Sequence, residues 1–307
     1  MQYDKRPLSF SEQADLLISR GMTGDRRLMV QRLRSVSYFR LSGYSYPFRK
    51  KDPANPGCPH SDFEPGTEFA TIWERYVFDR RLRLVVMDAV ERIEVAIRSE
   101  IATHHSTTHG HSAYARDPKS MPGMNWQTWV DFVGTVKREQ VRSKDVFVRH
   151  FRSKYAEADP LPLWMAAEVW SFGTLLSFYE GCGSGVRKAV AEKFGVHDNV
   201  FASWLLTLNT VRNICAHHGR LWNREIGTKP KIPERLAEWR TPVRVTGDRV
   251  FAVLTICKWC LDRIASQSRW PLRLRELLEA YPGVPRESMG FPSHWERCPI
   301  WTTSART

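Results

Sequence analysis

The stretch that decides the fold is residues 67–105, TEFATIWERYVFDRRLRLVVMDAVERIEVAIRSEIATHH. Apolar side chains recur in it every three or four residues, which is the spacing of one buried face of an α-helix. If unbroken, this helix is about 57 Å long. The side chains that mark the expected buried face are Trp73, Tyr76, Val77, Leu84, Met87, Val90, Ile93, Ile97 and Ile101.

Helical periodicity is also widespread on both sides of this stretch, whereas strand patterns are scarce. Between the expected helices lie an aromatic segment broken by glycine and proline (38–48), a polar loop (50–66), a second loop (106–124) and an aromatic, proline-rich tail (281–307). Helices are expected over 9–20, 24–36, 126–140, 144–156, 163–180, 185–194, 198–218, 247–267 and 270–280.

These patterns predict an all-α fold with a small N-terminal helical subdomain over 1–66 and a helical core over 67–307. The chain has no run of about 18 apolar residues, so no membrane span is expected. Its first residues, MQYDKR, lead into a polar helix rather than an apolar signal core, which predicts a cytoplasmic protein.

The charge balance favours an anionic partner. The 46 lysines and arginines outnumber the 33 aspartates and glutamates, for a formal net charge of +13. Nucleic acid is the commonest such partner, although a basic, solvated surface alone would explain the excess. The six cysteines, Cys58 among them, are expected to be buried thiols. Cys257 and Cys260 have ligand spacing but lie in an apolar periodic stretch, so neither a metal nor a cofactor is expected.

The helix expected over 198–218 carries the most informative set of side chains. Asn209, Asn213 and His217 form a polar ridge with a spacing of four residues. Arg212 instead falls inside the apolar stripe, where a guanidinium is unfavourable unless it is paired or opens onto a polar cavity. Gly219 is expected to end the helix, which places His217 and His218 in its last turn. The apolar stripe itself is Phe201, Trp204, Leu205, Leu208, Val211 and Cys215.

This set suits metal-independent RNA cleavage. Arginine binds phosphate with bidentate hydrogen bonds, and histidine removes the ribose 2′-hydroxyl proton or protonates the leaving 5′-oxygen. The products carry a 2′,3′-cyclic phosphate, and DNA is excluded because it lacks the nucleophile. The plain alternative is that Arg212 pairs with a buried carboxylate and the histidines only end a helix.

The residues Arg212-Asn213 followed by His217 resemble the R-x4–6-H signature of HEPN ribonucleases. The longer string Arg212-Asn213-Ile214-Cys215-Ala216-His217-His218, followed by Arg220-Leu221-Trp222-Asn223-Arg224, resembles the Abi-like abortive-infection proteins of bacteria, of the AbiD/AbiF type. Further blocks that resemble this family are Tyr38–Tyr44, Phe78–Arg83, Glu91–Glu94, Leu163–Glu168, Ser171–Gly173 and Met289–Pro292 with Trp295.

The resemblance implies a HEPN-like helical bundle and a role in phage defence. It implies that Arg212 holds the scissile phosphate and that Asn213 orients the imidazole or the phosphate. It further implies that His217 acts as general acid or base, with His218 as its substitute. The implied partner is RNA, both as substrate and as a bound small non-coding RNA. The alternative is a non-catalytic RNA-binding or scaffold protein with the same fold, and a DNA-binding regulator is a third.

HEPN nucleases usually combine two motifs, from two protomers or from two halves of one chain, so a homodimer is possible. The second candidate is Arg98 with His105, which shares its helical ridge, or with His104 if the helix unwinds near Thr103. An ordinary helix pair between Arg98 and Glu94 is the competing explanation.

Further arginines are expected to contact the RNA backbone, in which case binding weakens as salt rises. Alternatively, they are simply solvated. They are Arg75, Arg80, Arg81 and Arg83 on the long helix, and Arg220 and Arg224 after the motif.

Overall fold

The computed structural model describes residues 6–52, 60–155 and 160–302. The regular elements in these ranges are helices, and β-pairing in them is limited to the isolated bridges Thr23–Glu68 and Arg49–Phe63. The prediction of an all-α fold is therefore confirmed. None of the helices in these ranges combines the length and apolar character that crossing a bilayer requires.

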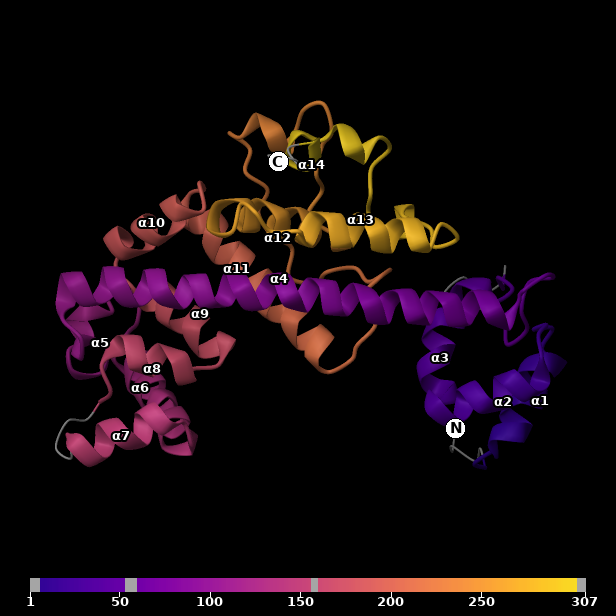
Figure 1. The fold of residues 1–307 in the computed structure, drawn as a ribbon, viewed down its shortest axis with the longest axis horizontal. Helices are drawn as coiled ribbons and strands as arrows, with labels where there is room; N and C mark the ends of the chain where they lie inside the picture. The colour runs from indigo at the N-terminus through magenta and orange to yellow at the C-terminus, as the bar shows by residue number, and fades with distance from the viewer. Residues whose placement is uncertain (1–5, 53–59, 156–159, 303–307) are drawn as a thin grey trace. The chain divides into compact units, whose positions relative to one another are not determined.

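The long helix predicted from the opening stretch is α4, Phe69–His109, and it runs unbroken (Figure 1). It continues past residue 105, so the loop expected from 106 begins later. Val90, Ile93 and Ile97 are fully buried as predicted, but Leu84 is 60% exposed. The buried stripe before Val90 instead follows Phe78, Leu82 and Val86.

The chain forms two compact units, Met1–Leu82 with Arg275–Pro285, and Arg83–Leu274 with Arg286–Thr307. The first unit contains α1 (Phe10–Ser19), α2 (Arg26–Ser35) and α3 (Tyr38–Ser45). The expectation of a broken segment over 38–48 is wrong, because Ser37 caps a helix there by accepting from the Arg40 N–H. The proline lies in the 3-10 turn η1, Tyr46–Phe48, where its missing N–H is tolerated.

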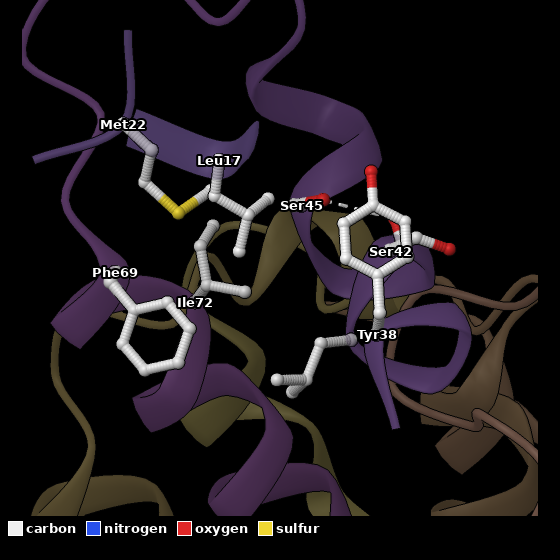
Figure 2. Close-up of a pocket in the computed structure, with 8 residues that line it drawn as sticks. Leu17, Met22, Tyr38, Ser42, Ser45, Phe69 and Ile72 are labelled. Carbon is white, nitrogen blue, oxygen red and sulfur yellow. Dashed lines mark hydrogen bonds between the residues drawn. The ribbon is translucent and has the colours of Figure 1, made fainter. Parts of the chain in front are cut away.

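A small, mainly apolar cavity lies within the first unit (Figure 2). Its volume of about 10 Å³ leaves space for about one water molecule. We therefore regard it as a packing gap in a core. The side chains around it are Leu17, Met22, Tyr38, Leu41, Ser42, Ser45, Phe69 and Ile72.

The second unit has one break that the sequence pattern did not predict. The helix expected over 163–180 is two helices, because Ser171 accepts from the Thr174 N–H at 3.2 Å and caps a new helix. The elements of this unit include α5 (Ala113–Arg116), α6 (Trp126–Arg142), α7 (Val146–Lys154), α8 (Leu163–Val169), α9 (Phe172–Gly181), α10 (Ser184–Lys193), α11 (Asp198–Ala216), α12 (Val250–Ile264) and α14 (Pro299–Thr302), while α13 (Trp270–Ala280) straddles the division.

The core of the second unit is built on α12, whose residues from Val250 to Leu261 are all buried. The aromatic tail packs on it, with the Phe251 and Phe291 rings 4.6 Å apart. Cys58 lies outside the described residues, and the other five cysteines are buried, as predicted. Burial raises the pKa of the Cys257 thiol well above its ordinary value, which disfavours the thiolate form that binds metals.

Candidate functional site

Helix α11 has the two faces that its sequence predicts. All six residues of the apolar stripe, from Phe201 to Cys215, are buried. On the polar ridge Asn209 is half-buried, whereas Asn213 and His217 are exposed. The stripe therefore anchors α11 in the core, and its C-terminal end presents polar side chains to solvent.

The end of α11 differs from the sequence expectation. The helix ends at Ala216, and the residue in the left-handed conformation is His218, with φ +58°, rather than Gly219. The His218 N–H donates to the Cys215 carbonyl at 3.0 Å and the Gly219 N–H to the Ile214 carbonyl at 2.7 Å, the two bonds of a Schellman motif. A histidine in this conformation is strained, and such strain is concentrated at functional sites.

Arg212 is half-buried and extends from the apolar stripe toward the polar ridge. Its Nη1 donates to Asn213 Oδ1 at 3.3 Å. Within the described ranges no carboxylate pairs with Arg212. The buried ion pair that would give Arg212 a purely structural role is therefore not found there. The other guanidinium N–H groups accordingly stay available for an anionic ligand.

The segment after α11 is fixed by a hydrogen bond from α4 and by the burial of its own apolar side chains. Arg83 of α4 is buried and donates from Nη1 to the Gly219 carbonyl at 3.3 Å. Leu221 and Trp222 are buried beyond it. This places Arg83 in the interior as a support for the turn, while Arg220 is half-buried and Arg224 is exposed.

The Arg98 side chain is enclosed rather than open to solvent, with 7% of its surface exposed. It forms an ion pair with Glu94 and donates to the backbone carbonyls of Ala167 and Trp170, the latter at 2.8 Å. These three partners surround the guanidinium and connect α4 to the break between α8 and α9. These contacts give Arg98 a structural role, because they join two parts of the fold and leave its guanidinium enclosed.

His105 is fully buried. Its ring lies 5.0 Å from that of Phe178 and 4.9 Å from that of His109, and neither ring nitrogen has a hydrogen-bond partner of normal geometry among the described residues. Burial, and secondly the charge of His109, lower the pKa of His105 to about 4, which the nearby Ser120 backbone only partly offsets. His104 is half-exposed, 3.4 Å from the Glu100 carboxylate.

The two arginine–histidine motifs are not brought together within one chain. Arg83 touches the turn that follows His217, and Arg98 lies fifteen residues further along the same helix, which is roughly 22 Å. The end of α11 thus brings together Arg212, Asn213, His217 and His218, and the Arg98 motif lies elsewhere.

The arginines expected to contact RNA have different environments. Arg80 and Arg81 are exposed, and the Arg81 guanidinium lies 5.4 Å from the centre of the Tyr281 ring. Arg75 is half-buried and stacks on Phe48 at 4.1 Å, and burial lowers its pKa. Only part of the expected cluster is therefore placed to contact a ligand from solvent.

A polar groove that the sequence patterns did not predict lies between the segment after α11 and the loop before α12. Its lining includes Asn223, Asp248, Arg249 and Glu287. Gly290 also lines the groove. It belongs to the block Met289–Pro292, whose resemblance to the Abi-like family was the one signal in the sequence that could have drawn attention to this place. No cluster of three or more histidine, cysteine or acidic side chains in the described ranges is arranged to hold a metal ion.

The fold and this site define an all-α protein with one arginine–asparagine–histidine cluster at a helix end. A family model described as "Abi-like protein" matches residues 31–223, which is more than half of the chain. The chain therefore belongs to the Abi-like family, and membership suggests defence against phage by abortive infection. No curated protein and no solved structure matches it significantly.

Proposed function

We propose that this protein is a metal-independent endoribonuclease of the HEPN type, close to the AbiD/AbiF proteins, that acts in abortive infection in the cytoplasm. The observation that carries the proposal is the Arg212 guanidinium, which has no acidic partner among the described residues and lies beside Asn213 in the last turns of α11. The exposed His217 and the strained His218 at the same helix end support it.

The proposed reaction is an internal transesterification. Arg212 binds the non-bridging phosphate oxygens, and Asn213 holds the guanidinium through their hydrogen bond. An imidazole removes the 2′-hydroxyl proton, the 2′-oxygen attacks phosphorus, and the 5′-oxygen leaves with a proton from a second acid. His217 fills one of these roles. Because Arg98 and His105 are enclosed, we expect a second α11 end, in a homodimer, to supply the other.

The second candidate is a non-catalytic RNA-binding or scaffold protein, with a small structured RNA as its partner. The enclosed Arg98 and His105 favour this candidate. HEPN nucleases usually combine two arginine–histidine motifs, and only the Arg212 motif of the two candidates is exposed in each chain. The exposed Arg80, Arg81 and Arg224 suit the RNA backbone in either case.

Incubating the purified protein with 5′-labelled RNA in EDTA distinguishes the two candidates. We expect cleavage with 2′,3′-cyclic phosphate ends, and a loss of roughly 10²–10⁴-fold in His217→Ala, the range for removal of a general acid or base. Arg212→Ala should be similarly impaired, while His150→Gln, a change at an exposed histidine of α7, should cleave normally. Tight RNA binding without products would support the scaffold instead.

A further inference from the structure

The second and third helices of the first unit carry a dense positive charge. Residues 26–51 contain eight arginines and lysines and no aspartate or glutamate, in a chain whose net charge is +13. Asp25, just before this segment, accepts from the Arg27 and Leu28 N–H groups as the N-cap of α2, so its carboxylate is engaged at the helix end. Such a segment attracts anions. The eight residues are Arg26, Arg27, Arg32, Arg34, Arg40, Arg49, Lys50 and Lys51.

Two of these arginines form a ridge on the solvent side of α2. Arg27 and Arg34 are seven residues apart, which is two helical turns and about 10 Å along the helix axis. Both are exposed, and no carboxylate of the described residues pairs with either guanidinium. Arg26 differs, because it forms an ion pair with Asp15 at 2.6 Å. Arg27 and Arg34 therefore keep their N–H groups available for a phosphate.

The start of α3 presents an aromatic ring to solvent. Among the described residues, Phe39 is the most exposed large apolar side chain, at 86%. Leu41 and Tyr44 of the same helix are buried, so α3 packs on the core without Phe39. An exposed phenyl ring forgoes the hydrophobic gain of burial, and a partner that covers it is stabilised.

The ring and the arginine ridge lie close together along the chain. Only two residues, 36 and 37, separate α2 from α3, and the two helices adjoin (Figure 1). Phe39 follows Arg34 by five residues, which limits the distance between their Cα atoms to at most about 17 Å. One elongated ligand can therefore contact both, if it carries anionic groups and flat apolar groups in alternation.

A single strand of RNA has both kinds of group, because each nucleotide carries an anionic phosphate and a base with a flat face. Guanidinium groups bind phosphate through paired hydrogen bonds, and exposed aromatic rings stack on unpaired bases. A duplex fits less well, since its bases are already stacked inside the helix. A membrane surface requires a continuous apolar helix face. The apolar faces of α2 and α3 instead pack inward, through Met29, Leu33, Leu41 and Tyr44.

We propose that α2 and the start of α3 bind a single-stranded segment of RNA. Arg27 and Arg34 bind its phosphates, and one of its bases stacks on Phe39. This surface is separate from the residues of the candidate site at the end of α11, and it holds RNA without reacting with it. The assignment rests on the proposed ribonuclease function for its source of RNA.

The test is binding of a fluorescein-labelled, single-stranded 2′-O-methyl oligonucleotide to the full chain, followed by fluorescence anisotropy at several salt concentrations. The 2′-O-methyl group blocks the nucleophile, so the probe stays intact whether or not the protein is a ribonuclease. Phe39→Ala should weaken binding roughly fivefold or more, the effect of losing one stacked base, and leave the salt dependence unchanged. Arg27→Gln and Arg34→Gln should each lower the slope of log K against log salt by about 0.7, the value for one phosphate contact on a single strand.

Matched variants separate stacking and local charge from general effects. Phe39→Tyr keeps an aromatic ring and should bind like the wild type, whereas Phe39→Leu keeps only apolar bulk and should resemble Phe39→Ala. Lys188→Gln, at an exposed position of α10, removes one positive charge outside this surface and should keep the wild-type slope. Phe39, Arg27 and Arg34 are all exposed, so their substitution leaves the core intact.

Failure of this proposal is distinct from failure of the ribonuclease. Wild-type affinity in Phe39→Ala, an unchanged slope in both arginine variants, or equal affinity for the duplex form of the probe would overturn the RNA surface, even if the protein cleaves RNA. A poly-glutamate peptide of equal charge that binds as tightly as the probe would also overturn it, because the partner would then be an acidic protein. Ring-dependent binding of the single strand supports the surface, even if no RNA is cleaved.

Discussion

Replacing His105 with phenylalanine is expected to stabilise the protein, increasingly so in acid. In the fold, His105 is buried and neutral, with a pKa lowered from 6.5 to about 4. The unfolded chain takes up a proton near pH 6.5, so native stability is lost as pH falls from 6.5 toward 4. At 1.36 kcal/mol for each unit, this loss reaches about 3 kcal/mol.

The variant His105→Phe has no proton to bind, so that loss should disappear. It also removes two ring nitrogens that lack a hydrogen-bond partner of normal geometry, a burial that typically costs about 1–3 kcal/mol. The phenyl ring takes the place of the imidazole beside Phe178. We therefore expect a modest gain in the free energy of unfolding at pH 7 and a larger gain at pH 4.5.

Urea unfolding followed by circular dichroism between pH 7 and 4.5 measures both effects. His150→Gln, at an exposed position, should follow the wild type throughout. If His105→Phe keeps the wild-type pH dependence, or is the less stable protein at pH 7, the inference of a buried, neutral imidazole is refuted. We also expect the variant to retain RNA cleavage, whereas a catalytic His105 would lose it.

Three further substitutions test the packing. Arg98→Met should lower the free energy of unfolding by about 3–5 kcal/mol in urea titrations, because the half-buried Glu94 carboxylate and the enclosed Ala167 and Trp170 carbonyls lose their partner. Gly123→Ala should lower it by about 1–3 kcal/mol, because the new Cβ would overlap the Glu180 carbonyl; an unchanged midpoint would contradict that contact. His218→Gly should raise the melting temperature, since it relieves about 1 kcal/mol of left-handed strain, and a drop would mean that the imidazole contributes more than the strain it imposes.

Local patterns determined which segments are helical. The three-to-four residue spacing identified α4 and the buried stripe of α11, because the burial period of a helix is a property of neighbouring residues. The same reasoning failed at residues 163–180, where the Ser171 cap ends one helix and starts another. It also failed at Leu84, because helical periodicity does not tell which of two neighbouring rows of apolar side chains packs in the core. The buried row is the one through Leu82 and Val86.

The sequence by itself determined the side chains of the candidate site, since Arg212, Asn213 and His217 lie within six consecutive residues of one helix end. Tertiary structure decided their environments. Arg98 resembles Arg212 in sequence, yet its partners Ala167 and Trp170 lie about seventy residues away and enclose it. The groove at Asn223 likewise depends on Glu287, 64 residues later. Proximity between such distant residues follows from packing, and no local spacing encodes it.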